Sequence, residues 1–338
     1  RFSNSLSNSV LLILLFISSF TMFMAGLVAN FEFDLKKIIA FSTLSQLGLM
    51  ISVLSLGESK LAFFHLLMHA LFKALLFMCA GCMIHMMNNC QDIRYMGSMI
   101  KFIPLTSSFF NICNLSLCGL PFLCGFYSKD LILEFMSMNY INFYIYMIFY
   151  ISTGLTVMYT LRLIYYTMIS DLNSISYFSL VDSSDKMLKG MGGLILLVIF
   201  CGSITMWLIF PTPFMICLPL LMKLMVLFTI FSGIFLGYFI SLFSLMDKSK
   251  IMIFYNLSFC VSSIMNMNFL STFGVNYYFL YFGNKYNIVI DQGWSEYYGS
   301  QNMFNMMKNS CVFLQNLFFN NMKIFLVLFL IWIFILLF

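Results

Sequence analysis

Long apolar segments separated by short polar ones dominate the pattern along the chain. They lie near residues 9–29, 38–57, 61–87, 104–138, 140–168, 190–210, 219–245 and 322–338. Each approaches or exceeds the roughly 20 residues that a helix needs to cross a bilayer, although the last is short. The pattern therefore predicts an all-α polytopic membrane protein.

The fourth apolar segment is interrupted. Gly119, Pro121 and Gly125 fall within seven residues, and a proline removes a backbone donor and clashes with the preceding turn of a helix. We predict that the helix breaks here. Broken helices mark ion pathways, because their freed carbonyls must face protein or water.

Between residues 288 and 320 the pattern becomes that of an amphipathic helix. The apolar positions that recur at three- and four-residue steps include Trp294, Phe304, Met307 and Leu314. Polar residues lie mostly on the opposite side, so we expect a lateral helix that lies flat on the membrane surface. Residues 251–287, rich in Asn, Ser and Tyr, are interpreted as a connecting segment, and residues 321–338 as a terminal transmembrane helix.

Basic residues fall mostly on one side of the predicted membrane. Those that the eight segments place in loops on this side are Lys36, Lys37, Arg94, Lys101, Lys186, Lys189, Lys248 and Lys250. Only Lys60 lies in a loop on the other side. The positive-inside rule makes the first side cytoplasmic, or matrix in a mitochondrion, and the lateral helix follows a segment that ends there.

Composition excludes several classes of protein. With 62% hydrophobic and 9% charged residues and a mean hydropathy of +0.97, the chain is too apolar for a soluble domain. A net charge of +5 without basic runs argues against nucleic acid. The ten cysteines are scattered, and the single pair Cys79 and Cys82 is weak evidence for metal or redox chemistry. Abundant Phe and Met with few Arg suggest a mitochondrial gene.

Ionisable side chains inside the third apolar segment are the strongest candidates for chemistry. His65, His69 and Lys73 stand four residues apart, so they share one face of a helix. Lys73 lies roughly 18 Å or more of helix from either end of the segment, beyond the reach of a snorkelling side chain. A charge at this depth costs about 2.5 to 3.5 kcal/mol, which favours a function in ion movement over packing alone.

Polar side chains also occur in two neighbouring segments. Ser42, Thr43, Ser45 and Gln46 cluster over a turn and a half of the second segment and could hold water against the histidines and Lys73. Ordinary helix packing through hydroxyl groups explains them equally well.

Three further ionisable residues follow the predicted break: Lys129, Asp130 and Glu134. Snorkelling is a real alternative for Lys129, which is nearer a segment end than Lys73. Arg162, near the end of the fifth segment, is interpreted as an interfacial anchor.

Several motifs in order resemble one family. They are ANFEFDLKKIIAFSTLSQLGLM, FFHLLMHALFKALLFMCAGCMIH, QDIRYMG, GLPFLCGFYSKDLILE and DQGWSEYYG. Together they resemble the chain 5 family of mitochondrial NADH:ubiquinone oxidoreductase, respiratory complex I, as found in invertebrates such as insects. The likeness covers essentially the whole chain.

The resemblance implies a membrane-arm subunit with two inverted five-helix repeats, extra helices and a lateral helix. It assigns residues 1–170 to the second antiporter-like repeat, 171–189 to a matrix loop and 190–250 to additional transmembrane helices. The family's first repeat is expected to be absent from this sequence. The implied location is the mitochondrial inner membrane, with the lateral helix on the matrix side.

Residue roles follow from the same resemblance. Lys73 matches the central lysine of the repeat, His65 and His69 the histidines before it, and Lys129 the lysine that leads protons outward, with Asp130 and Glu134 beside that exit. The family holds no cofactor in this chain, while NADH, FMN, iron–sulfur clusters and ubiquinone belong to the whole complex. Implied partners are the antiporter-like chains 4 and 2, accessory subunits and lipids such as cardiolipin, and no nucleic acid.

These features favour a proton relay through His65, His69, bound water, Lys73 and Lys129, with the two lysines disfavouring each other's charge. Two alternatives stay open at this point. The chain could belong to a multisubunit cation/proton antiporter that shares these helices, or it could be a structural strut whose buried charges only specify helix pairing. No set of residues indicates a redox or hydrolytic site of its own.

Overall fold

The computed structural model describes residues 3–138, 142–174, 180–182, 185–212, 215–242, 255–263, 267, 269–319 and 322–338. Within these ranges the chain is helical, with a single isolated β-bridge between Asp34 and Asp92 and no strand. Six of the described helices are long and apolar enough to cross a membrane, or seven if a bent pair near the C-terminus counts as one span. The predicted all-α polytopic membrane fold is confirmed.

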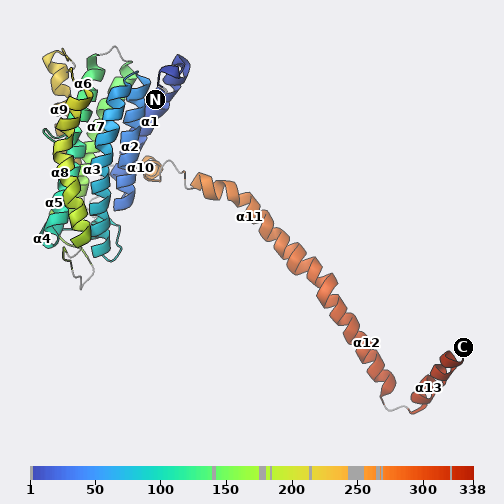
Figure 1. Cartoon of the computed structure of the whole chain (residues 1–338). Helices are drawn as coiled ribbons and strands as arrows, with labels where there is room; N and C mark the ends of the chain where they lie inside the picture. Colours follow the sequence, from blue (N-terminus) through green and yellow to red (C-terminus); the bar gives the residue numbers. More distant parts are fainter. Residues whose placement is uncertain are drawn as a thin grey trace. The chain divides into compact units, whose positions relative to one another are not determined.

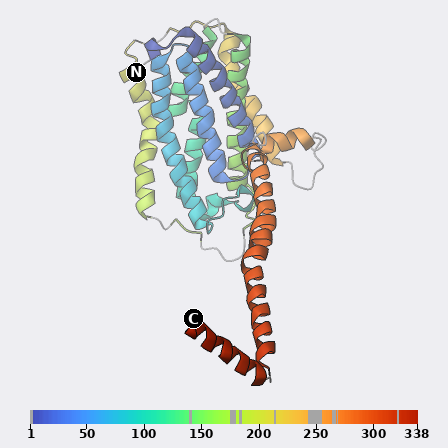
Figure 2. The ribbon, with the colours of Figure 1, turned by 90° about the vertical axis from the view of Figure 1, so that its right-hand side faces the viewer.

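The chain divides into two compact units, residues 1–265 and 266–338, each of which is considered by itself. The first unit is a helical bundle (Figures 1 and 2). Its long helices are α1 (Asn8–Phe31), α2 (Leu35–Ser55), α3 (Ser59–Met86), α7 (Phe143–Ile164), α8 (Asp185–Ile209) and α9 (Leu220–Leu242). Helix α3 packs against α2, α5 (Pro104–Cys118) and α8, while α7 packs against α1 and α9. A short helix, α10 (Tyr255–Ser262), contacts α1.

The fourth predicted span is broken as expected. Helix α5 ends at Cys118 on Gly119, which adopts the left-handed conformation with φ +85° that a residue without Cβ accepts readily. The chain then turns through Pro121 into a π-helical turn, η3 (Phe126–Asp130), and helix α6 (Leu131–Met138). A Cβ at Gly125 would collide with the Ser116 carbonyl, so glycine allows the two halves to approach closely.

Loops between the helices meet at one end of the bundle. The Leu35 backbone N–H donates to the Gln91 carbonyl at 2.8 Å, and the Ile93 N–H donates to the Phe33 carbonyl at 3.0 Å. The Ser98 N–H donates to the Ser170 carbonyl, also at 2.8 Å. The short elements η2 (Ile93–Tyr95) and α4 (Met99–Phe102) lie in these loops, and π-helical η4 (Tyr165–Ile169) leads into one of them.

The described basic residues of the predicted positive side lie at this same end of the bundle. Lys36, Lys37, Arg94 and Lys101 belong to the joined loops or to the helix turns beside them, and Lys186 and Lys189 lie in the first turns of α8. Lys248 and Lys250 fall outside the described residues. The short connections at the other end include the one with Lys60.

Two arginines enclose the Phe33 ring at this end. Arg94 lies over the ring with 4.3 Å to its centroid, and Arg162 with 5.1 Å. The prediction that Arg162 is an interfacial anchor is wrong, because its side chain is only 4% exposed and its guanidinium donates to the Glu32 carbonyl. Sequence position alone does not show that a neighbouring helix end supplies an acceptor and an aromatic face.

Arg94 also forms a salt bridge with Asp92. Its Nε and Nη2 donate to the carboxylate at 2.6 to 3.1 Å, and its backbone N–H donates to the same group at 3.0 Å. Partial burial alone would raise the pKa of Asp92, but the hydrogen bonds from Arg94 lower it overall. The same side-chain hydrogen bond raises the pKa of Arg94. This pair holds a local turn in the loop after α3.

The second unit is a run of helical segments. They are η6 (Phe269–Gly274), α11 (Val275–Tyr286), η7 (Asn287–Ser295), η8 (Tyr297–Gln301), α12 (Asn302–Phe318) and α13 (Met322–Leu337). None of their described residues is buried.

The helical run begins at Phe269, earlier than the predicted start at residue 288. The connecting segment 251–287 is therefore largely helical where it is described. The sequence after Pro219 contains no proline, and aromatic pairs one turn apart support the helix, with ring centroids of Phe273 and Tyr277 5.4 Å apart. This helix was not predicted because its polar residues interrupt the apolar pattern of the sequence.

Candidate functional site

Buried polar side chains from α3 and the broken helix form one row inside the bundle. This polar row consists of Lys73, His69, His65, Ser128 and Lys129. All five are less than 9% exposed, with Ser128 at 0% and His65 at 1%. Helical spacing places the three α3 residues on one face. Ser128 and Lys129 reach the same interior because they lie in the π-helical turn η3 directly after the break.

His65 connects three elements. Its Nδ1 lies 3.0 Å from the Ser128 hydroxyl, and its Nε2 lies 3.2 Å from Oε1 of Gln46 on α2. An amide oxygen only accepts, so this geometry fits the neutral ring with its proton on Nε2 and with Nδ1 accepting from Ser128. His65 therefore links the middle of α2 to the turn that carries Lys129.

His69 lies between His65 and Lys73. Its ring centroid is 6.2 Å from that of His65 and 5.3 Å from that of Phe72, against which it packs edge to face. Its Nε2 is buried and makes no hydrogen bond within the described residues. A buried ring nitrogen without a partner is uncommon, and it is the type of group that an ordered water or a transferred proton satisfies.

Lys73 and Lys129 occupy the two ends of the row. Lys73 donates to the Ser42 hydroxyl of α2. Lys129 donates to the Thr156 hydroxyl of α7 at 2.8 Å and to the Leu117 carbonyl at 3.4 Å. Leu117 lies in the last turn of α5, so the break supplies one of the acceptors for Lys129.

Neither lysine of the row forms an ion pair. The two salt bridges among the described residues join Lys37 to Asp34 and Arg94 to Asp92, outside the row. A buried ammonium that is held only by hydroxyl and carbonyl oxygens is not fixed in its charged form by an adjacent carboxylate. Hydroxyl and carbonyl oxygens are instead the partners that the structure gives to the two lysines.

The contacts of the histidines order the row. The Ser128 hydroxyl that contacts His65 belongs to the residue directly before Lys129 in η3, and His69 lies one helical turn from both His65 and Lys73. The structure thus orders the row as Lys73, His69, His65 and then Lys129. Sequence order alone suggested that a proton would leave the histidines through Lys73 first.

The acidic residues beside the break differ in their surroundings. Asp130 is 7% exposed, and its Oδ1 lies against Gly119 with no hydrogen-bond partner among the described residues. Glu134 is half-buried on α6. Asp130 is therefore the acidic group in direct continuation of Lys129.

The predicted water-lining residues of α2 divide between two faces. Ser42, Ser45 and Gln46 are buried at 2% exposure each and lie toward α3 and α7. Thr43 is half-buried and its hydroxyl donates to the Ala40 carbonyl, away from the row. Adjacent residues on a helix point about 100° apart, which separates Thr43 from the other three.

Two contributors were not identified from the sequence. Thr156 accepts from Lys129, and Tyr159, also on α7, has a fully buried hydroxyl beside Ser45 and Gln46 that makes no hydrogen bond of standard geometry. The spacing of Thr153, Thr156 and Thr160 is the only signal that marks this face of α7 in the sequence.

The predicted lateral-helix residues Trp294, Phe304, Met307 and Leu314 are all exposed, between 49% and 68%. Trp294 stacks on Tyr298 with ring centroids 5.4 Å apart. In the part of the chain that the structure describes, no group of three or more His, Cys, Asp or Glu side chains could hold a metal ion.

Comparison with protein families decides the relationship. The family model described as "NADH dehydrogenase subunit 5 C-terminus" matches residues 159–338, more than half of the chain. The chain belongs to the NADH dehydrogenase subunit 5 family. A second family model, "NADH:quinone oxidoreductase/Mrp antiporter, TM", matches residues 1–156 of this subunit 5 homologue. The predicted resemblance is confirmed.

Curated relatives agree. The chain is 52% identical over 324 residues to "NADH-ubiquinone oxidoreductase chain 5" of Anopheles quadrimaculatus, 96% of this chain and 56% of that protein. It is 51% identical over 337 residues to the protein of the same name in Aedes aegypti, 99% of this chain and 58% of the relative. The Locusta migratoria protein is also 51% identical, over 96% of this chain. This subunit 5 homologue thus spans a little over half the length of these relatives.

Proposed function

We propose that this chain moves protons across the mitochondrial inner membrane as an antiporter-like subunit of respiratory complex I. Electron transfer from NADH to ubiquinone elsewhere in the complex would drive the movement, and the chain would have no redox site of its own. FMN and iron–sulfur clusters would lie in other subunits. The observation that carries the proposal is His65, which joins α2 and the π-helical turn of Lys129 through Gln46 and Ser128.

The geometry suggests an order for the relay. A proton that reaches Lys73 passes to the unpartnered Nε2 of His69, and a water between the two rings carries it to His65. A charged His65 disfavours the charge on Lys129, because like charges in a low-dielectric interior repel. The proton of Lys129 then moves toward Asp130, which extends the row beyond the break.

The C-terminal helices support a second part of the proposal. Their apolar side chains are exposed, so neighbouring subunits, accessory subunits or lipids such as cardiolipin would cover them. We propose that residues 288–320 lie along the matrix surface and contact the antiporter-like chains 4 and 2. The predicted segment boundaries at residues 170, 189, 250 and 321 remain part of this proposal.

Replacing Lys129 with Met tests the relay in the assembled complex. The variant keeps the length of the side chain but cannot carry a proton, so we expect proton pumping to be abolished. Oxidation of NADH by an artificial acceptor at the flavin site should be unchanged. Lys60→Met, at an exposed lysine at the start of α3, is the matched control. Normal pumping by Lys129→Met would refute the role of Lys129.

A cation/proton antiporter subunit is the alternative that one observation favours, because the model matching residues 1–156 also describes Mrp antiporters. Transport that requires sodium would decide for it. A purely structural strut is distinguished by deleting residues 285–338 and measuring assembly and pumping separately. A strut loses assembly and has no pumping defect in the complexes that still form.

A further inference from the structure

Two thiol–thioether pairs lie between α3 and α8, outside the polar row. Cys79 Sγ is 3.5 Å from Met191 Sδ, and Cys82 Sγ is 3.8 Å from Met187 Sδ. Cys79 and Met191 are 0% exposed and Cys82 is 2% exposed. We call these four residues the sulfur cluster.

Helical register places the two pairs along the same interface between α3 and α8. The two cysteines are three residues apart and the two methionines four, so each pair lies on one face of its helix. The helices run in opposite directions, because the earlier cysteine meets the later methionine. The cluster is therefore a paired arrangement across one helix interface.

We propose that the sulfur cluster is a binding site for a monovalent soft metal ion of the Cu(I) and Ag(I) class. Thiolates and thioethers are the ligands that such ions prefer over oxygen and nitrogen. A tetrahedral ion with metal–sulfur bonds of about 2.3 Å separates its ligands by about 3.8 Å. The sulfur–sulfur distance within each pair, 3.5 Å for Cys79 and Met191 and 3.8 Å for Cys82 and Met187, is close to that separation.

Charge and access also fit this class of ion. When the ion binds, one S–H bond breaks, one metal–sulfur bond forms and the proton leaves to water. One thiolate and a monovalent cation make a neutral complex, which an apolar interior accepts far better than a net charge. Met187 is 41% exposed at the start of α8, where it offers an entry route.

Silver ion, which needs no reductant, is the probe. In the assembled complex we expect Ag(I) to protect Cys79 and Cys82 together from a small membrane-permeant thiol reagent, quantified by mass spectrometry of their peptides. The double variant Met187→Leu/Met191→Leu keeps both thiols and nearly the same volume. It should raise the Ag(I) concentration for half protection at least tenfold, whereas Met215→Leu, at an exposed methionine, should not.

Equal protection in the wild type and the double variant would overturn the four-sulfur site, as would no protection in the wild type. If both thiols resist the reagent without silver, the silver content of the purified complex decides. One fewer ion per chain in the double variant than in the wild type supports the proposal, and equal contents overturn it. Neither measurement depends on proton pumping, so the result is independent of the function proposed above.

Discussion

The helical bundle and the C-terminal helices differ in how far their side chains are buried. In the bundle, charged groups such as Lys73, Lys129 and Arg162 are less than 5% exposed, and each donates to an acceptor within the same chain. In residues 269–319 and 322–338 no described residue is buried, and Phe304 and Trp332 are 66% and 65% exposed. The bundle therefore supplies the hydrogen-bond partners of its own buried charges. The apolar side chains of the C-terminal helices, in contrast, need lipid or another protein to cover them.

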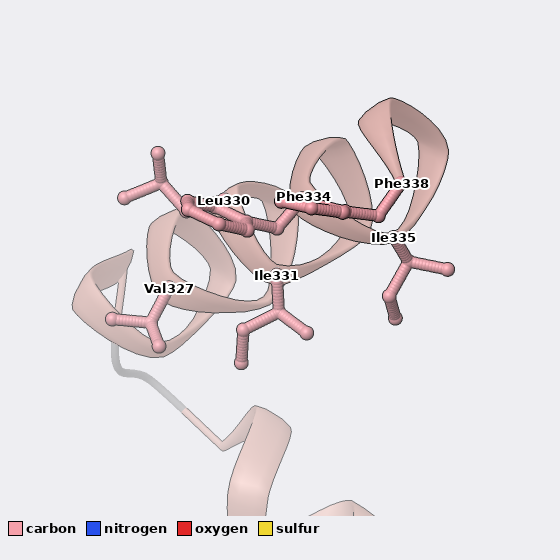
Figure 3. Close-up of a pocket in the computed structure, with 6 residues that line it drawn as sticks. All are labelled: Val327, Leu330, Ile331, Phe334, Ile335 and Phe338. Carbon is pink, nitrogen blue, oxygen red and sulfur yellow. The ribbon is translucent and has the colours of Figure 1, made fainter.

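The two C-terminal helices need different surroundings. Helix α12 has apolar and polar sides, which suits a boundary between water and an apolar partner. Helix α13 is apolar on all sides after Lys323 in its first turn. Figure 3 shows the carbon-only side chains of Val327, Leu330, Ile331, Phe334, Ile335 and Phe338 around one part of it. A helix of this type is stable in lipid or packed among other helices.

Replacing one lysine in each region should give the largest difference in proton pumping. Lys73→Met should reduce proton pumping by the assembled complex at least tenfold, because the proposed relay would lose its proton carrier at one end of the row. Lys308→Met, at an exposed lysine of α12, should leave pumping nearly unchanged. Proton uptake per NADH oxidised is the measurement. If both variants pumped normally, the buried charge would be structural and the comparison between the regions would have no functional meaning.

Hydropathy and spacing predicted much of the bundle and part of the site. Apolar length located the spans, Gly119 and Pro121 located the break, and four-residue spacing placed His65, His69 and Lys73 on one face. Span length, the helix break and the shared helix face depend only on local backbone geometry and on hydrophobicity. Both can be inferred from the order of residues in the sequence.

Contacts between side chains of different helices could not be predicted from the sequence. Nothing in the spacing shows that His65 meets Ser128 and Gln46, or that Lys129 takes an acceptor from α7. Arg162 has the position of an interfacial anchor, yet the chain before α2 provides its carbonyl and aromatic partners. The early start of the C-terminal helical run was missed because its residues are polar and aromatic and are not buried in this chain.

Glycine substitutions test how tightly the bundle determines its own site. Gly125→Ala places a methyl group on the Ser116 carbonyl, so we expect a destabilisation of about 1 to 3 kcal/mol and displacement of the turn with Ser128 and Lys129. Gly81→Ala on α3 meets nothing within 4 Å and should be neutral or stabilise the helix by up to about 1 kcal/mol. Thermal stability and pumping of the assembled complex are the measurements. Equal behaviour of the two variants would contradict the close packing at the break.

Exposed apolar residues of α12 test the need for outside partners. Phe304→Ser combined with Leu314→Ser should lower the amount of assembled complex several-fold, since both side chains are exposed in the chain alone. The bundle should be unaffected, so the complexes that do assemble should pump protons at the normal ratio per NADH. Native gels quantify assembly. Asn305→Ser, at an exposed polar residue of the same helix, is the control. A lowered pumping ratio with normal assembly would move function into the C-terminal unit.

The Asp92 and Arg94 pair gives the smallest expected effect, because the Arg94 side chain is 42% exposed to water. Asp92→Asn should destabilise the loop after α3 by no more than about 1 kcal/mol. Cys90, two residues away, reports this loop, and its labelling by a thiol reagent should accelerate up to about fivefold relative to wild type. Because folding lowers the pKa of Asp92, the contribution of the pair is fully present above the ordinary aspartate pKa of about 3.9 and is lost as the pH falls further. The ratio of labelling rates should therefore be constant between about pH 6 and pH 8. A ratio that changed within this window would assign the protection to a different titrating group.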